Sequence, residues 1–208
     1  MTKRKVFEYG GMLAGVMLIA FGIGALWLSI DARSTVKDEL ARENIVGSPD
    51  MSPEGIQPGI EEASLDVEAP SCDVADEPID TGSEARCFSE YMRIHALESS
   101  GGLTYAEMGR FLAADDPENP AGTSDEEAAL TDEEGNPVPN AARNTWVTET
   151  SLSTALNLSY MAEQLALFGI VVGVALILTG IGFLVLAIGG ALRHSRAEAP
   201  AAEKAALA

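Results

Sequence analysis

Four side chains of this 208-residue sequence are of the types that most often bind metals or act as nucleophiles: two cysteines and two histidines. Cys72 and Cys87 are 15 residues apart, and His95 follows them closely. A structural zinc site needs four thiolate or imidazole ligands, which these three residues do not supply. We therefore expect Cys72 and Cys87 to form a disulfide, which stabilises a chain by about 3 kcal/mol when it closes a loop of this length.

The two histidines are not expected to share one catalytic site. His95 and His194 lie on either side of a long apolar segment, whereas a non-haem iron site of the facial-triad type needs two histidines and a carboxylate in one pocket. Serine and aspartate are frequent, but no pattern joins them to a histidine as nucleophilic catalysis requires. The sequence therefore predicts a protein that is not an enzyme, with no cofactor and no metal site.

Acidic residues are concentrated in the middle of the chain. Residues 31–163 hold 29 of the 32 acidic residues and seven of the 13 basic ones, which gives this region a net charge of −22. Such a field repels nucleic acid and anionic lipid headgroups, so neither is expected to bind here. The densest clusters are Asp115, Asp116 and Glu118; Asp125, Glu126 and Glu127; and Asp132, Glu133 and Glu134. They lack the spacing of an EF-hand loop, and solvated loops are expected.

Two apolar segments are each long enough to cross a membrane as a helix. Uncharged runs cover residues 9–30 and 164–192, and about 20 apolar residues in a helix span a hydrocarbon core of about 30 Å. The first run is too long for the apolar part of a cleaved signal peptide and has no small-x-small cleavage site after it. We predict transmembrane helices at 9–30 and 160–192, joined by the acidic region 31–159.

The two spans are similar in sequence. GMLAGVMLIAFGIGALWLSI (11–30) and GIVVGVALILTGIGFLVLAI (169–188) are identical at 11 of 20 positions without a gap. Each carries small residues at GxxxG spacing followed by two steps of seven, which lines one helix face and allows a neighbouring helix to approach closely. These residues, the glycine seam, are Gly11, Gly15, Gly22 and Ser29 in the first span and Gly169, Gly173, Gly180 and Ala187 in the second.

The glycine seam predicts helix packing, either between the two spans of one chain or between neighbouring copies. Residues 10–30 and 164–192 contain no ionisable side chain, although transporters usually carry intramembrane charge or interrupted helices. Transport is therefore disfavoured.

Basic residues near the spans predict the orientation. Those beside the first span divide evenly between its two ends, whereas the second span is followed by three basic residues and preceded only distantly by Arg143. We therefore predict cytoplasmic tails at 1–8 and 193–208, and an extracytoplasmic region at 31–159. The tail residues concerned are Lys3, Arg4, Lys5, Arg193, Arg196 and Lys204.

Apolar residues at helical spacing predict an all-α fold, with two antiparallel transmembrane helices and a small, partly irregular helical domain between them. After the first span, a short helix with a capping-box pair at Thr35 and Asp38 is expected to continue from the membrane. Further helices are expected at 83–98 and, with a second capping box at Thr104 and Glu107, at 103–113.

The remaining segments of the central region are expected to differ sharply in order. Residues 47–84 and 114–140 are rich in proline, glycine and carboxylates, and we predict irregular linkers there. From a start between residues 141 and 153, one long helix is predicted to run to about residue 192. Its first part would carry four side chains that can pack on the other helices of the domain: Trp146, Leu152, Leu156 and Tyr160.

Three segments resemble a family of uncharacterised two-span membrane proteins of actinobacteria. They are TVKDELARENIVGSPDM (35–51), LTYAEMGRFLA (103–113) and RNTWVTETSLSTALNLSYMAEQLALFGIVVGVALILTGIGF (143–183). Members sometimes carry the label of an aromatic ring-opening dioxygenase, an activity that the separation of the two histidines disfavours here. The resemblance implies a bacterial plasma membrane protein and no catalytic residue.

Together these features favour a membrane-anchored structural or interaction protein that presents an acidic domain, as an accessory subunit or in a homo-oligomer. Its expected partners are membrane lipid and other membrane proteins or further copies of itself. A cation or ligand sensor that acts through a partner is the alternative, and a dioxygenase-like enzyme is a disfavoured third.

Overall fold

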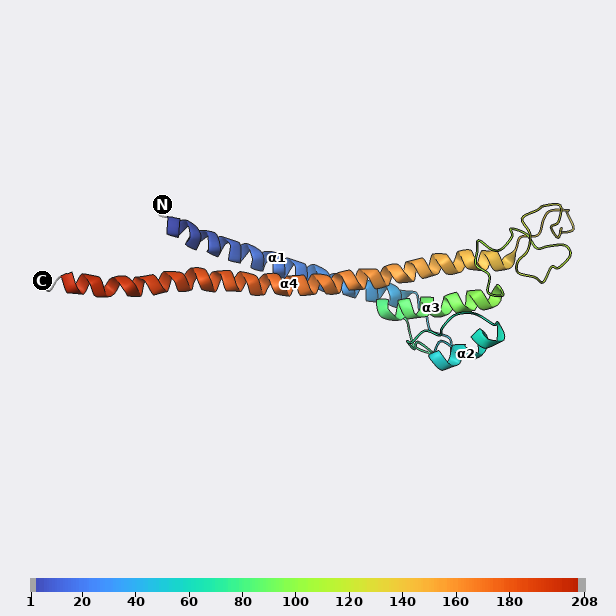
Figure 1. Cartoon of the computed structure of the whole chain (residues 1–208), viewed down its shortest axis with the longest axis horizontal. Coiled ribbons are helices and arrows are strands. Elements are labelled where there is room, and N and C mark those ends of the chain that lie inside the picture. Colours follow the sequence, from blue (N-terminus) through green and yellow to red (C-terminus); the bar gives the residue numbers. More distant parts are fainter. Residues whose placement is uncertain (1–2, 206–208) are drawn as a thin grey trace. The chain divides into compact units, whose positions relative to one another are not determined.

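The computed structural model describes the backbone of residues 3–205 and the side chains of residues 8–189. These residues form four helices: α1 (Lys3–Arg42), α2 (Pro53–Glu62), α3 (Gly82–Ser99) and α4 (Ala141–Ala205) (Figure 1). No strand is present among them, and the extended segments meet only in isolated β-bridges. The all-α prediction is confirmed in this respect. The tail side chains used to predict the orientation, and the side chain of His194, lie outside the described residues.

The chain divides into two compact units. The span unit consists of Met1–Ser34 and Gln164–Ala208, and the inserted domain is Thr35–Glu163. Each unit contains part of α1 and part of α4, because both helices run through the boundary.

Two helices are long and apolar enough to span a membrane, by length and composition, over Glu8–Arg42 and Ala141–Gly189. Helix α1 continues without a break from the apolar segment to Arg42. The predicted helical continuation is therefore confirmed, but Thr35 and Asp38 do not cap a new helix, since both lie inside α1. Helix α4 begins at Ala141, the upstream limit of the predicted range, and its backbone runs past residue 192 to Ala205.

The prediction of an irregular linker at 47–84 is wrong in part. Helix α2 lies within it, where Ser52 accepts a hydrogen bond from the Gly55 amide at 3.0 Å and Pro53 occupies the first turn. Five apolar side chains from this segment are buried in the main core of the domain: Met51, Ile56, Ile60, Val74 and Ile79. The segment therefore buries apolar surface in spite of its many prolines and carboxylates.

Helix α3 is held at both its start and its middle. Thr81 and Glu84 form a capping box, in which the Thr81 hydroxyl accepts from the Glu84 amide and the Glu84 carboxylate accepts from the Thr81 amide. The predicted disulfide is present between Cys72 and Cys87, with 6.1 Å between their Cα atoms. Tyr91, which is fully buried, donates a hydrogen bond at 2.6 Å to the Cys72 carbonyl.

The helix predicted at 103–113 does not form. Glu107 accepts hydrogen bonds from the amide and hydroxyl of Thr104, as in a capping box, but only a turn follows. Phe111 instead exchanges backbone hydrogen bonds with Thr123, and a Cβ on Gly109 would collide with the Thr123 backbone. Close backbone pairing with a distant segment has overridden the local helical pattern.

Candidate functional site

The glycine seam brings α1 and α4 together inside the span unit. A Cβ added to Gly15 would lie 2.8 Å from the Gly180 carbonyl oxygen, and one added to Gly22 would lie 2.7 Å from that of Gly173. Real Cβ atoms do not approach backbone oxygens so closely, so these positions tolerate only hydrogen. Residues early in α1 contact residues late in α4, so the contacts run in opposite order along the two helices.

The seam contacts are symmetric with respect to the sequence repeat. The repeat relates each residue of the first span to the residue 158 positions later. Under this shift the contact of Gly11 with Ala187 becomes that of Gly169 with Ser29.

The large side chains that flank the seam obey the same relation. Leu184 packs over Gly15 as Leu26 packs over Gly173, and Ile177 packs over Gly22 as Ile19 packs over Gly180. The sequence repeat is therefore a repeat of one packing face, which appears once on each helix and contacts its own counterpart.

The other faces of the two helices are apolar and exposed. Gly24 and Gly182 belong to the repeat but have open space where a Cβ would be. Among the large exposed side chains of the span unit are Leu13, Met17, Phe21, Trp27, Leu165, Phe168, Val171, Leu178 and Leu186. A surface of this kind suits a hydrocarbon environment better than water.

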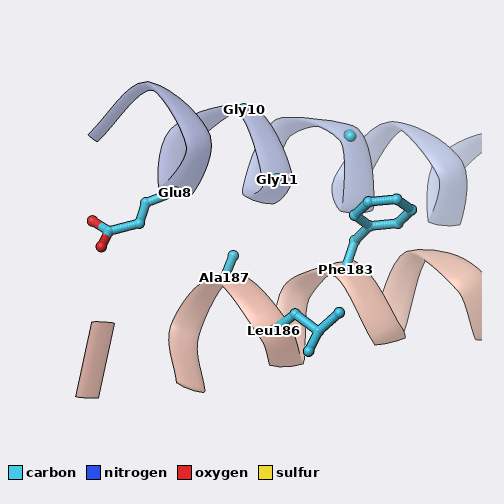
Figure 2. A pocket seen from close by; sticks show the side chains of 7 residues that line it. Glu8, Gly10, Gly11, Phe183, Leu186 and Ala187 are labelled. Carbon is cyan, nitrogen blue, oxygen red and sulfur yellow. The ribbon is translucent and has the colours of Figure 1, made fainter. Parts of the chain in front are cut away.

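One end of the seam opens into a cleft of about 440 Å³, lined by apolar side chains and glycines with a single carboxylate, Glu8. Figure 2 shows Gly11 of α1 opposite Ala187 of α4, with Phe183 and Leu186 beside them and Glu8 at the edge. Among the described residues that line the cleft, no acid, base and nucleophile form a catalytic set.

In the inserted domain, α3 lies along the first part of α4 (Figure 1). The Trp146 indole donates a hydrogen bond at 3.1 Å to the fully buried Ser100 hydroxyl, and Arg93 stacks on the Trp146 ring at 5.1 Å. Further along, Arg86 stacks on Tyr160 at 4.9 Å. Of the four side chains expected to pack on the domain, Trp146 and Leu156 are buried, Tyr160 is partly buried and Leu152 is exposed.

The start of α4 is fixed by Asn140, which is fully buried. Its side-chain amide donates to the carbonyls of Gly109 and Pro120, and its side-chain oxygen accepts from the Ala142 amide at 3.1 Å. Asn140 thus caps the helix and ties the segment around residues 109–123 to it. Asn140 was not among the predicted residues, although asparagine before an uninterrupted helical pattern is a recognised start signal.

His95 is paired with Asp50, with 2.9 Å between the imidazole Nε2 and the carboxylate Oδ2. Partial burial by itself would raise the pKa of Asp50, but the hydrogen bond from Ser48 and the nearby His95 outweigh it, so the pKa lies below its ordinary value. The pair joins α3 to the turn before α2. The pair is therefore a structural contact between α3 and the segment before α2. Two side chains are too few for a metal site.

Two grooves flank the contact between α3 and α4, and Glu149 of α4 lines both. The first, of about 590 Å³, also contains His95, Asn144 and Thr148. The second, of about 520 Å³, contains Arg86 and Arg93. Glu149 itself is only 6% exposed, and no pattern in the sequence distinguishes it from the other acidic residues.

The acidic clusters lie in exposed turns. Asp132 accepts hydrogen bonds from the backbone amides of Asn136 and Glu134, and the Asn136 bond is the main cause that lowers the pKa of Asp132. The Asp132 carboxylate therefore already accepts hydrogen bonds from the backbone of its own turn. Among the described residues no group of three or more His, Cys, Asp or Glu side chains is arranged to hold a metal ion.

Comparison with protein-family models, with curated proteins and with solved structures found no match to the chain.

Proposed function

We propose that the chain is an integral protein of a bacterial plasma membrane that acts as a structural or interaction subunit. In this proposal α1 and α4 cross the membrane as an antiparallel hairpin, and the inserted domain is presented on the extracytoplasmic side. The resemblance to two-span actinobacterial proteins agrees with this location. The disulfide also agrees with it, because structural disulfides persist in oxidising compartments.

The observation that carries the proposal is the symmetric glycine seam between two apolar helices. In hydrocarbon, apolar side chains gain little by leaving lipid, so helices associate through close backbone approach at small residues. The closest contacts of the span unit are of this kind, and its largest side chains point away from the seam. A soluble helix pair would have the opposite arrangement, with large apolar side chains between the helices.

The seam also bears on the choice between partners. Because each seam face is occupied by the other helix of the same chain, the seam is not needed to join copies of the protein. We therefore favour an accessory subunit over a seam-mediated homo-oligomer. The surfaces left for partners are the outward apolar faces of the hairpin and the acidic domain, whose negative field suits basic proteins.

An engineered cross-link tests the hairpin. A Cβ on Gly11 would lie 3.4 Å from the Ala187 Cβ, close to the separation found in disulfides. In membranes, Gly11→Cys with Ala187→Cys should therefore oxidise to a disulfide within one chain, detected by loss of maleimide labelling without a dimer band on a non-reducing gel. A covalent dimer would instead mean that the seams of neighbouring copies face each other.

The pair Gly24→Cys with Gly182→Cys is the matched control, since both positions face open space. Extraction with alkaline carbonate tests the anchor independently: the protein should stay with the membrane pellet, and release into the supernatant would refute the membrane assignment.

Chemical cross-linking in native membranes, followed by mass spectrometry, tests the interaction role. A subunit should be recovered joined to other membrane proteins through the inserted domain. Recovery of the uncross-linked monomer alone would count against an interaction role.

A further inference from the structure

Helix α4 differs from the other helices of the inserted domain in the charge of its exposed surface. Between Asn144 and Ala162 its only charged residue is Glu149, and Glu149 is buried. The exposed side chains of this stretch are therefore all uncharged, although residues 31–163 have a net charge of −22. The exposed charged residues of the other helices include Glu54, Glu61 and Glu62 of α2 and Arg86, Glu90 and Arg93 of α3. Charged residues are depleted at the centres of protein interfaces, so this surface of α4 has the composition of an interface.

One side of the same stretch has the residue spacing of a contact between two helices. Val147, Ser151, Thr154, Leu158 and Met161 follow one another in alternating steps of four and three, which places them along one side of the helix. We call these five residues the outer face. All of them are exposed, and the large ones strongly so, at 50% for Val147, 63% for Leu158 and 56% for Met161. Apolar side chains of this size are thus presented to water within the inserted domain.

The hydroxyl groups of the outer face already donate hydrogen bonds within α4. Ser151 donates at 2.7 Å to the Val147 carbonyl, and Thr154 donates at 2.6 Å to the Thr150 carbonyl. Thr148, which lies beside the outer face, donates in the same way to the carbonyl four residues earlier. Burial of a hydroxyl is costly mainly when its hydrogen-bonding groups lose their partners. The outer face can therefore leave water at little cost, although it contains polar residues.

We propose that the outer face binds the outer face of a second copy of the chain, with the two α4 helices side by side and parallel. The parallel arrangement rests on the proposed function, because two copies anchored in one membrane have the same orientation. Two domains of the same high negative charge repel each other, and like charges placed opposite one another disfavour a contact. The outer face is a surface through which two copies can meet without such pairs.

The heptad spacing also favours a second copy over other partners. In a parallel pair of identical helices each residue of the outer face meets its own counterpart, so Leu158 and Met161 pack on Leu158 and Met161, and the small Ser151 allows close approach. A basic partner fits less well, because the outer face contains no carboxylate and the exposed acidic turns would draw such a partner elsewhere.

Oxidative cross-linking of the full chain in membranes tests the proposal. Leu158→Cys should form a covalent dimer, seen as a band of twice the mass on a non-reducing gel, because the same position of the two copies lies at the contact. Leu152→Cys is the matched control, since Leu152 is also exposed but lies on a different side of α4. It should give at least fivefold less dimer. The native cysteines are paired with each other and do not compete.

A charge placed on the outer face gives a second, independent measurement. Ser151→Glu, introduced together with Leu158→Cys, puts two like charges opposite one another and should lower the yield of dimer at least fivefold. Ser83→Glu makes the same replacement at an exposed position in the first turn of α3 and should change the yield less than twofold. Ser151 is exposed in the single chain, so an unchanged urea midpoint of the domain should show that Ser151→Glu folds normally.

Each outcome separates the proposed dimer from the proposed function. Equal yields from Leu158→Cys and Leu152→Cys, or a yield that Ser151→Glu does not lower, would overturn the dimer. A product that joins Leu158→Cys to a different protein, identified by mass spectrometry, would overturn the second copy as the partner and support the interaction role. Absence of dimer from protein that stays in the alkaline-carbonate pellet would refute the dimer alone, whereas release from the membrane would refute the proposed function.

Discussion

In the span unit the two helices meet through glycines that leave no room for a Cβ, whereas the inserted domain combines close approaches of this kind, as at Gly47 and Gly109, with a core of large side chains from separate segments. Gly15 and Gly180 leave no room for a Cβ, while Tyr91 and Trp146 are buried and each donates a hydrogen bond to a distant residue. The domain is further closed by a disulfide. The difference agrees with the proposed membrane location: burial of large apolar surface stabilises structure in water, and close backbone approach stabilises helix pairs in lipid.

The largest effect should come from filling the seam. Gly15→Leu combined with Gly173→Leu would place side chains where backbone oxygens lie 2.8 and 2.9 Å away, so the two helices must separate. We expect the Gly11→Cys with Ala187→Cys cross-link to be almost abolished in this background. The control Gly24→Leu with Gly182→Leu adds the same bulk on the open faces and should leave the cross-link intact. Equal loss of the cross-link in both backgrounds would mean that the seam does not hold the two helices together.

Removal of the disulfide should be the next largest effect, and it should be confined to the domain. Cys72→Ser with Cys87→Ser should lower the free energy of unfolding of the domain by about 3 kcal/mol, because the open chain gains entropy. Pulse proteolysis in urea measures this change, and the reduced wild-type protein should behave like the variant. The seam cross-link should be unaffected, and its loss would mean that the two units depend on one another.

The two tryptophans allow a matched comparison of the units. Trp146→Phe removes the hydrogen bond to Ser100 and weakens the stacking of Arg93, so it should destabilise the domain by about 1 to 2 kcal/mol in the same proteolysis assay. Trp27→Phe changes a residue that is 69% exposed and should have no effect on the domain. Similar losses for both variants would contradict the assignment of Trp146 to the core.

The smallest effect should be a dependence of domain stability on acid pH. The pKa of Asp50 is lower in the folded protein than its ordinary value of 3.8, so the carboxylate stabilises the fold above that value. This stabilisation should be lost as the pH falls below 3.8 through the folded pKa. Urea midpoints measured from neutral to acid pH should therefore fall less steeply for Asp50→Asn than for the wild type. The exposed Asp66→Asn should retain the wild-type slope.

The sequence was most informative where the structure is local and periodic. The boundaries of α3 agree within one residue at each end with the prediction, and the glycine spacing placed all eight seam residues on two faces that do meet. The disulfide followed from having two cysteines. In each case the information lies within one segment or one residue pair.

The prediction failed where distant segments decide the structure. Ile56 and Ile60 are one helical turn apart, a signal that the surrounding prolines and acids obscured, and they are buried in a cluster that also contains Val74 and Ile79. Thr104 and Glu107 carry the pattern of a helix start, but pairing of Phe111 with Thr123 prevents the helix. The true capping box, Thr81 with Glu84, has the same spacing and was overlooked. Glu149 differs from the other acids only through its burial, which no local pattern encodes.

In the proposed membrane hairpin, the symmetry of the seam means that helix packing does not determine the orientation. Turning the helix pair over exchanges Gly15 with Gly173 and Gly22 with Gly180, and the same set of contacts results. The packing energy of the pair is therefore nearly the same in either orientation. Packing at the seam cannot determine which end of the proposed hairpin faces the cytoplasm. The orientation then has to be determined outside the seam, by the unequal charges of the segments that flank it. If the helices cross a membrane as proposed, reversing those charges should invert the protein without changing how its two helices pack.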